Sequence, residues 1–233
     1  MRRKRHSKFK TLSRYNRAYM TPQELKSNAK SFYVYTDLDG TPVITTKIGI
    51  NLGTKCFQSF NEAYNFWLEE IERKNPDTII LEVDTSTYYI KDDRNSISYA
   101  YRILKGKQVI NEVANVYGSI PNEDTQIGTC GIAEIIGATY ALRELQNYDF
   151  SQVIIRYDNK YVKQVASGIQ LDVSEDSLGY IKEYIDEYKK IAINCPVSFH
   201  HVFSHVGDIA HDNVDKNARK TNAKVKKAIL ANN

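Results

Sequence analysis

The stretch "VSFHHVFSHVGDIAHDNVDKNAR", residues 197–219, changes character along its length. Its first part belongs to a run, 196–203, in which apolar and polar residues alternate as in a β-strand. Its last part opens a basic run, 213–230, that we expect to form the final helix. His205 lies between the two, and Asp215 follows ten residues later at the expected start of the helix. Strand ends and helix starts gather at one edge of a sheet, so both side chains are candidates for a site there.

Upstream of this stretch, strand-like and helix-like runs follow one another in a definite order. Three strands joined by short links come first, then a long helix, a buried strand and two more helices. The expected strands are 78–86, 96–105, 107–118 and 151–158, and the expected helices are 131–148, one that begins near 159, and 174–191. Together with the opening stretch, this order predicts an α/β protein whose mixed sheet is antiparallel at first and parallel later, with helices on its faces.

Three more acidic residues fall at strand ends or helix starts. Asp84 lies within the first of these strands, Glu134 in the first turns of the long helix, and Asp158 at the end of the buried strand. Four carboxylates that converge with Asp215 would repel one another, and divalent cations relieve such repulsion. Oxygen-only sites suit Mg²⁺ or Mn²⁺, and two such ions about 4 Å apart can hold a phosphodiester. A single strand-end Asp is more often a cap, so the prediction depends on the whole set.

The segments that carry these acids resemble the four signature segments of type 1 ribonuclease H. They are "EVDTS" at 82–86, "GIAEIIGATYAL" at 131–142, "YDNKYV" at 157–162 and the opening stretch, in the family's order, and the similarity spans roughly 78–222, about 145 residues. The resemblance implies the ribonuclease H-like fold, with a five-stranded mixed sheet flanked by helices. It also implies hydrolysis of the RNA strand of RNA–DNA hybrids, which leaves 5′-phosphate and 3′-hydroxyl ends.

The same resemblance assigns roles to five residues. Asp84, Glu134, Asp158 and Asp215 would hold two Mg²⁺ ions, with Mn²⁺ as a substitute. His205 would be the histidine of a mobile loop that assists proton transfer or product release. All five are therefore candidate catalytic residues.

The sequence also departs from the family's pattern around the expected substrate. Thr85 and Ser86 stand where the family usually has Gly-Ser, and Gly131-Ile132-Ala133 precedes Glu134 where an Asn is common. His211-Asp212 replaces the usual Asn-Glu. We still expect Thr85, Ser86 and Asn159 to contact nucleic acid. These departures keep open a catalytically weak ribonuclease H-fold protein that only binds nucleic acid.

The N-terminal region shows a weaker resemblance of its own. The segments "SFYVYTDLDGTPVITT" (31–46) and "GTKCFQSFNEAYNFWL" (53–68) are similar to the viroplasmin-like hybrid-binding domain that precedes many cellular ribonucleases H. We therefore expect a small α+β domain over 31–74, a break at 75–78, and the catalytic domain over 78–233. A helix is expected over 59–74, with Phe60, Tyr64, Trp67, Leu68 and Ile71 on one face and Ser59 or Asn61 as the N-cap. Tyr33, Tyr35 and Lys47 are candidate contacts to nucleic acid, and the two tyrosines are expected to be exposed for stacking.

The run "DLDGT" at 37–41 supports a different function. In a haloacid-dehalogenase-like phosphatase, Asp37 would be the nucleophile and Asp39 the general acid/base. Such a nucleophile follows a fully buried parallel strand, which reads as a continuous apolar run. Here the preceding residues alternate, and Pro42 follows where an apolar residue normally stands. We favour a hairpin turn and keep the phosphatase as the second hypothesis.

Charge is distributed unevenly along the 233 residues. The net charge is +4, yet residues 1–20 hold eight basic residues and no acidic one, so the remainder carries 24 basic and 28 acidic groups. A basic arm over 1–30, without fixed structure, suggests contact with a polyanion such as the RNA–DNA hybrid. A nuclear or organellar address is an alternative use of this arm.

The remaining features bear on compartment and assembly. No apolar run approaches the roughly 18–20 residues of a membrane span, so no membrane contact is expected. The three cysteines, at 56, 130 and 195, fit neither a disulfide framework nor a zinc site. We expect a monomeric, cytoplasmic protein.

Overall fold

The computed structural model describes residues 32–37, 40–45, 54–90, 92–202 and 208–231. The basic arm, Asp39, Lys47 and His205 lie outside these described residues, so the predictions made for them stay predictions. The strands are β1 (Phe32–Thr36), β2 (Pro42–Thr45), β3 (Lys55–Phe57), β4 (Thr78–Tyr89), β5 (Arg94–Lys105), β6 (Gln108–Pro121), β7 (Gln152–Tyr157) and β8 (Val197–His201). The helices are α1 (Phe60–Lys74), α2 (Gly128–Leu145), α3 (Lys160–Ala166), α4 (Glu175–Ala192) and α5 (Ile209–Ala231).

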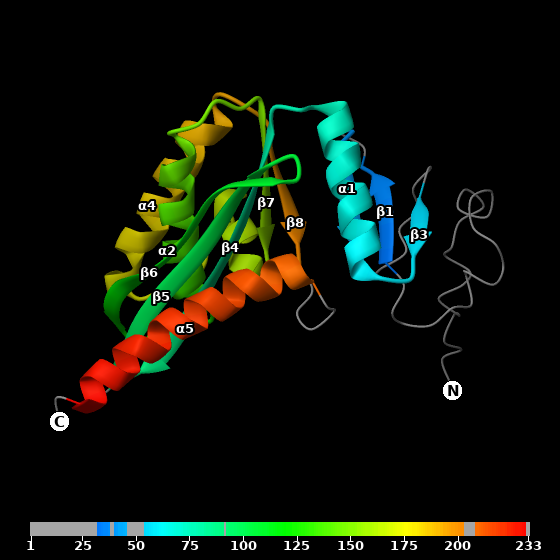
Figure 1. Cartoon of the computed structure of the whole chain (residues 1–233). Helices are drawn as coiled ribbons and strands as arrows, with labels where there is room; N and C mark the ends of the chain where they lie inside the picture. Colours follow the sequence, from blue (N-terminus) through cyan, green and yellow to red (C-terminus); the bar gives the residue numbers. More distant parts are fainter. Residues whose placement is uncertain (1–31, 38–39, 46–53, 91, 203–207, 232–233) are drawn as a thin grey trace, which may run out of the picture.

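The large sheet has five strands in the order β6-β5-β4-β7-β8. Strands β4, β5 and β6 are antiparallel neighbours, whereas β7 pairs parallel with both β4 and β8 (Figure 1). This is the five-stranded mixed sheet flanked by helices that the sequence predicts. The prediction of fold class is therefore confirmed.

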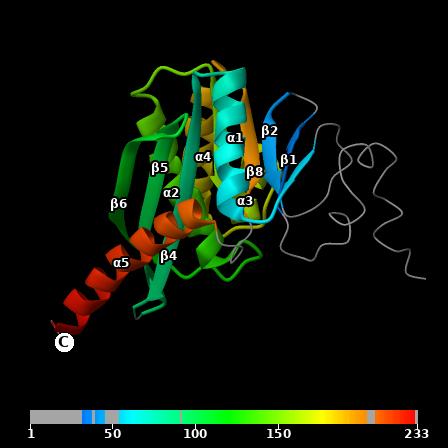
Figure 2. The same ribbon diagram turned by 45° about the vertical axis from the view of Figure 1, so that its right-hand side comes forward.

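Alternate residues of β4 face two different helical layers. Ile79, Leu81 and Val83 belong to the main core with buried residues of α2 and α4, whereas Ile80 belongs to a second core with α1. Successive side chains of a strand point to opposite faces, which explains the division. The layers are thus α2, α3 and α4 on one face of the sheet, and α1 with α5 on the other (Figures 1 and 2).

The N-terminal elements share a core with the large sheet. Strands β2, β1 and β3 form a small antiparallel sheet, and α1 lies between it and the large sheet (Figure 2). Trp67 of α1 is fully buried, and its indole N–H donates to the backbone oxygen of Pro42 at 2.7 Å. Leu104 and Ile154 of the large sheet are in the same apolar cluster as α1. The proposed boundary at 75–78 falls in the link between α1 and β4, and a separate domain of hybrid-binding function stays a prediction.

Most expected elements are present, with shifts of a few residues at their ends. The predicted capping of α1 is confirmed, since the Ser59 hydroxyl accepts from the backbone N–H of Glu62 at 3.2 Å. The final helix was expected to begin near Asp215, but α5 begins at Ile209. The reason is Asp208, whose side chain accepts from the His211 N–H and whose carbonyl accepts from the Asp212 N–H. Asp215 therefore lies in the second turn of the helix.

One expectation about the small sheet is wrong. Tyr33, predicted to be exposed for stacking, is only 4% exposed. Tyr35, on the same face of that strand, is half-buried. No described helix is both long and apolar enough to cross a membrane.

Candidate active site

One open cavity of about 550 Å³ brings together the four acidic residues singled out in the sequence. Asp84 comes from β4, Glu134 from α2, Asp158 from the residue after β7 and Asp215 from α5. The other lining residues are Thr85, Ser86, Thr87, Cys130, Asn159, His211, Asp212 and Arg219. The acids are separated by 24 to 57 positions in the chain, so this convergence is a product of the fold.

Strand register places two of the carboxylates side by side. Strands β4 and β7 run parallel with Glu82 opposite Arg156, so Asp84 and Asp158, two residues further on, come to the same level. Asp84 is 5% exposed and points to the face covered by α5. Asp158 follows the last residue of β7, where the chain turns into α3.

Glu134 reaches the cavity from the opposite face of the sheet. It is 7% exposed on α2, and its Oε1 accepts a hydrogen bond from the Thr85 hydroxyl at 2.6 Å. The helix packs closely here, because a Cβ on Gly137 would come within 2.5 Å of the Thr85 methyl group. This close approach fixes Glu134 beside β4.

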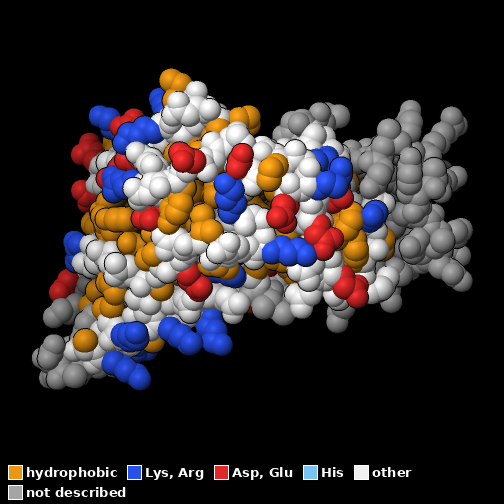
Figure 3. Space-filling model, turned by 45° about the horizontal axis from the view of Figure 1, so that its top comes forward, with side chains coloured by type: hydrophobic (Ala, Val, Ile, Leu, Met, Phe, Trp, Pro, Cys, Tyr) orange, Lys and Arg blue, Asp and Glu red, His pale blue; other side chains and the backbone are white. Residues whose placement is uncertain are grey.

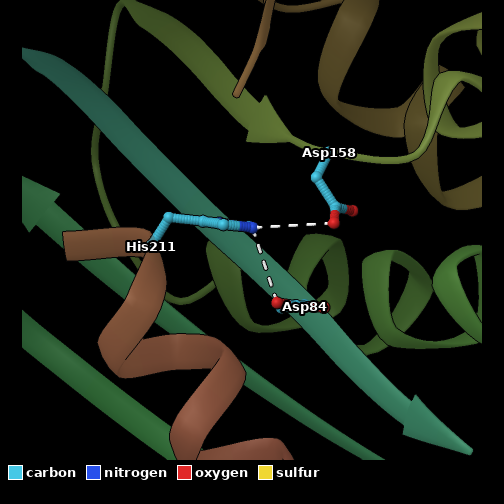
Figure 4. A group of neighbouring side chains, drawn as sticks. All are labelled: Asp84, Asp158 and His211. Carbon is cyan, nitrogen blue, oxygen red and sulfur yellow. Dashed lines mark ion pairs between the residues drawn. The ribbon is translucent and has the colours of Figure 1, made fainter. Parts of the chain in front are cut away.

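His211 was noted in the sequence only as a departure, and the structure places it inside the cluster. Its Nε2 lies 3.4 Å from Oδ2 of Asp84 and 3.9 Å from Oδ2 of Asp158 (Figure 4). These three side chains can present ligand atoms within 4.8 Å of one another. The sequence signal that could have found it is the pattern Asp208-x-x-His211, in which an N-cap aspartate fixes a histidine in the first turn.

The carboxyl groups of Asp84 and Glu134 hold protons more tightly than usual. Burial raises the pKa of Asp84 to about 7, and the charges of Asp158 and Asp215 add to this effect while His211 opposes it. Burial, followed by the charges of Asp84 and Asp158, also raises the pKa of Glu134 well above its usual range. These two groups favour their neutral forms unless positive charge is brought to them.

Asp158 and His211 behave as an ion pair at the other side of the cluster. Burial disfavours the charged form of Asp158, but its interaction with the His211 imidazolium outweighs burial and lowers the pKa of Asp158. Burial likewise opposes the charged imidazole, but Asp158 and Asp84 outweigh it and raise the pKa of His211. One imidazolium thus partly compensates several acids.

The donor set fits divalent cations. Carboxylate oxygens are the ligands that Mg²⁺ and Mn²⁺ prefer, and a bound cation would favour the charged forms of Asp84 and Glu134, whose pKa values burial raises. Asp215 differs from the other three, because its Oδ1 accepts from Nε of Arg219 at 2.5 Å. The assignment of all four as metal ligands stays a prediction.

A network of buried charged side chains lies next to the site and connects the elements that carry it. Arg156, 1% exposed, forms ion pairs with Glu82 and with Asp208, both buried. Its guanidinium also lies 4.8 Å from the ring centre of Tyr64 on α1. Because Asp208 caps α5, this network links β7 to the first turn that carries His211. An arginine within the otherwise apolar run "VIIRY" was the sequence signal for it, and sequence reasoning missed it.

The residues expected to contact nucleic acid have different surroundings. Thr85, Ser86 and Asn159 line the cavity. Thr85 also holds Glu134, and the Asn159 side chain caps α3 by accepting from the Tyr161 N–H at 3.1 Å. Tyr35 lies instead at a separate groove beside β8. The structure therefore brings three of the six candidates into the cavity.

Asp37, the nucleophile of the phosphatase hypothesis, lies in a hairpin turn. The Asp37 N–H donates to the Thr41 oxygen at 2.9 Å, and the Gly40 N–H donates to the Asp37 oxygen at 3.0 Å. Gly40 has φ +87°, which glycine adopts without strain. Strand β1 is antiparallel to both of its neighbours, so Asp37 does not follow the buried parallel strand that this hypothesis requires.

Comparisons with known proteins give structural similarities only. No family model matches the sequence, and no curated protein matches it significantly. Among solved structures, the chain is similar to RNase H1 from the halophilic archaeon Halobacterium salinarum, with 14% identity, a TM-score of 0.45, and coverage of 61% of this chain and 98% of that one. It is similar to the N-terminal RNase H domain of a Mycobacterium tuberculosis protein, with 16% identity, a TM-score of 0.48, and coverage of 65% and 98%. It is also similar to LC11-RNase H1, isolated from compost, with 17% identity, a TM-score of 0.48, and coverage of 64% and 98%.

Proposed function

We propose that this protein is a metal-dependent endoribonuclease that hydrolyses the RNA strand of RNA–DNA hybrids and leaves 5′-phosphate and 3′-hydroxyl ends. The proposal rests on one observation, the convergence of Asp84, Glu134, Asp158 and Asp215 in a single open cavity. The ribonuclease H-like sheet supports it, because β4 and β7 deliver two of these carboxylates to the same level.

The four carboxylates would hold two Mg²⁺ ions, with Mn²⁺ as a substitute. When bound, such ions activate a water molecule and neutralise charge on the reacting phosphate. Burial and mutual repulsion raise the pKa values of Asp84 and Glu134, and a bound cation would favour their charged forms.

Other residues of the chain would position the substrate and move protons. The Thr85 hydroxyl keeps Glu134 in place through its 2.6 Å hydrogen bond. Ser86 and Asn159 line the cavity and would face the sugar–phosphate backbone. His205 would supply a proton to the leaving 3′-oxygen or assist product release, as the resemblance of its segment implies.

A substrate panel tests this proposal. The protein is incubated with four end-labelled substrates, which are an RNA–DNA hybrid, single-stranded RNA, double-stranded RNA and double-stranded DNA, each with Mg²⁺ and with EDTA. We expect internal cuts in the RNA strand of the hybrid alone, only with Mg²⁺, and products that a ligase can join without prior phosphorylation. Equal cutting of double-stranded DNA, or cutting in EDTA, would refute the proposal.

A further inference from the structure

The second half of α5 is strongly basic. Residues 216–227 contain no acidic side chain and six basic ones. The basic residues are Lys216, Arg219, Lys220, Lys224, Lys226 and Lys227. All six are exposed. Figure 3 shows Lys and Arg side chains gathered at the end of the molecule where the chain terminates. We call this surface the basic ledge.

The lysines of the basic ledge point outward from a helix that is fixed on the sheet. Val214 and Ala218 on its inner face are fully buried against Ala100 of β5. The Ser98 hydroxyl donates to the Ala218 oxygen at 2.7 Å, which fastens the helix to the same strand. Within the described part of the chain, none of the five lysines forms an ion pair, so their charges are available to a partner.

The basic ledge begins at the candidate active site. Asp215 and Arg219 line the cavity, and from there α5 follows β4. The Asn222 side chain donates to the Ser86 oxygen at 2.8 Å, and Nζ of Lys226 lies 4.6 Å from the ring centre of Tyr88. At about 1.5 Å per residue, positions 216 to 227 extend about 16 Å along the helix.

A polyanion that enters the cavity would meet this surface next. Duplex nucleic acid carries about one negative charge per 1.7 Å of its axis, so a length of about 16 Å presents about nine charges. The ledge offers a row of cations of similar length. Outside residues 1–20 the chain has 24 basic and 28 acidic groups, so six bases without an acid are a local exception.

We propose that the basic ledge of α5 binds the phosphate backbone of a duplex whose scissile strand occupies the cavity. This proposal rests on the proposed function, since it extends the same site. The ledge contributes affinity and orientation through charge, without reading bases. Catalysis at the cavity does not require these lysines.

A matched pair of variants tests the ledge in the full-length chain. Lys220→Gln/Lys224→Gln removes two charges from α5, and Lys182→Gln/Lys189→Gln removes two exposed charges from α4 on the other face of the sheet. Gln keeps helix propensity close to that of Lys, so both variants should fold, which circular dichroism checks. Both changes are also made in an Asp158→Asn background, so that hybrid binding is measured without cleavage.

The readout is the dependence of hybrid affinity on KCl concentration. We expect the α5 variant to bind more weakly and its plot of log K against log [KCl] to be less steep by about 1.8, since each phosphate contact contributes roughly 0.9. The α4 variant should have the same hybrid affinity and the same salt slope as the unmodified protein. In the cleavage assay with residue 158 intact, the α5 variant should raise KM and leave kcat unchanged.

The outcomes separate this proposal from the proposed function. Equal affinity and equal salt slopes for the two variants would refute the proposal that the basic ledge binds the duplex, whether or not the hybrid is cleaved. Failure to cleave the hybrid, with a flattened slope for the α5 variant, would overturn the proposed function and leave the ledge as a duplex-binding surface. Binding of unmodified protein to phosphatidylserine vesicles, lost in the α5 variant while duplex binding is kept, would also overturn the ledge.

Discussion

At the scale of single residues, the candidate site is a balance between several acids and one imidazole. His211 lies within ion-pair distance of Asp84 and Asp158, and it stabilises their charged forms. Burial nevertheless raises the pKa of Asp84 to about 7. At neutral pH, ionisation of Asp84 in the metal-free site therefore costs folding free energy, and the stability of the protein should depend on pH.

Metal-free stability should fall as the pH rises from 5 to 8. The pKa of Asp84 is raised from 3.8 to about 7 on folding, so its stabilising contribution is complete below pH 3.8 and is lost as the pH rises through about 7. Between pH 5 and about 7 the loss is about 3 kcal/mol, because each pKa unit corresponds to about 1.4 kcal/mol. Thermal unfolding in EDTA measures it, and Asp84→Asn should make the pH dependence smaller, while part of it remains because the pKa values of Glu134 and His211 are also raised. An Asp84→Asn variant with the pH dependence of the unmodified protein would contradict the assignment.

Divalent cations should reverse this loss at pH 8. A ligand that binds only the folded state raises the unfolding temperature with its concentration. Addition of Mg²⁺ at pH 8 should raise the unfolding temperature of the unmodified protein and have little effect on Asp84→Asn. Equal shifts in both proteins would show that Mg²⁺ binds elsewhere.

His205 should act late in the reaction. Its role follows from the resemblance of its segment, and a positioned acid–base group contributes typically 10²–10⁴-fold, or less where product release is its task. His205→Ala should therefore lower turnover by roughly 10 to 10³-fold and leave hybrid affinity unchanged. His201→Ala is a control, because His201 lies beside the site, with a ring nitrogen 2.9 Å from the backbone oxygen of Asp158, and has no proposed role in proton transfer. Unchanged kinetics in His205→Ala would remove His205 from the catalytic set.

At the scale of elements, α1 packs into a core shared with the large sheet, whereas a helix of a separately linked domain would have a core of its own. It fills the face of the large sheet beside α5, where Leu68 and Trp67 pack with Ile80, Leu104 and Ile154. Tyr64 of the same helix donates to Oε1 of Glu82 at 3.0 Å, so α1 also covers the buried charge network. Removal of residues 1–76 would expose this apolar face.

Trp67→Ala should therefore destabilise the whole protein. Truncation of a fully buried Trp costs about 3–5 kcal/mol, and here the Pro42 oxygen also loses its donor. Chemical unfolding followed at β-sheet and helix signals should show one transition, shifted to lower denaturant. Phe66→Ala, at a half-buried position on the same helix, is the control and should cost less. Two separate transitions, with only the first one shifted, would show that residues 31–74 form an independent unit.

At the scale of the whole molecule, alternation and helical spacing were sufficient to predict a mixed sheet with helices on its faces. The positions of the four carboxylates at strand and helix ends were also sufficient to predict that they meet. Two features depended on tertiary contacts, and sequence reasoning missed both. His211 enters the site because Asp208 caps α5 and the helix begins early. Helix α1 packs on the large sheet, where it buries Ile154 and lies against the Arg156 guanidinium. Tyr33 was wrongly expected to be exposed, since strand alternation shows which residues share a face but not whether that face is covered.

One comparison of two variants tests the central claim most directly, which is that the cavity carboxylates and not the hairpin aspartate are the reactive groups. Unmodified protein, Asp158→Asn and Asp37→Asn are assayed on a labelled RNA–DNA hybrid with Mg²⁺ and on a generic phosphatase substrate. We expect Asp158→Asn to lose cleavage and keep hybrid affinity. Asp37→Asn should cleave the hybrid at a rate within about twofold of that of the unmodified protein. It should alter the free energy of unfolding by no more than about 0.5 kcal/mol, as surface changes usually do. Loss of all activity in Asp37→Asn, with Asp158→Asn unharmed, would contradict the claim.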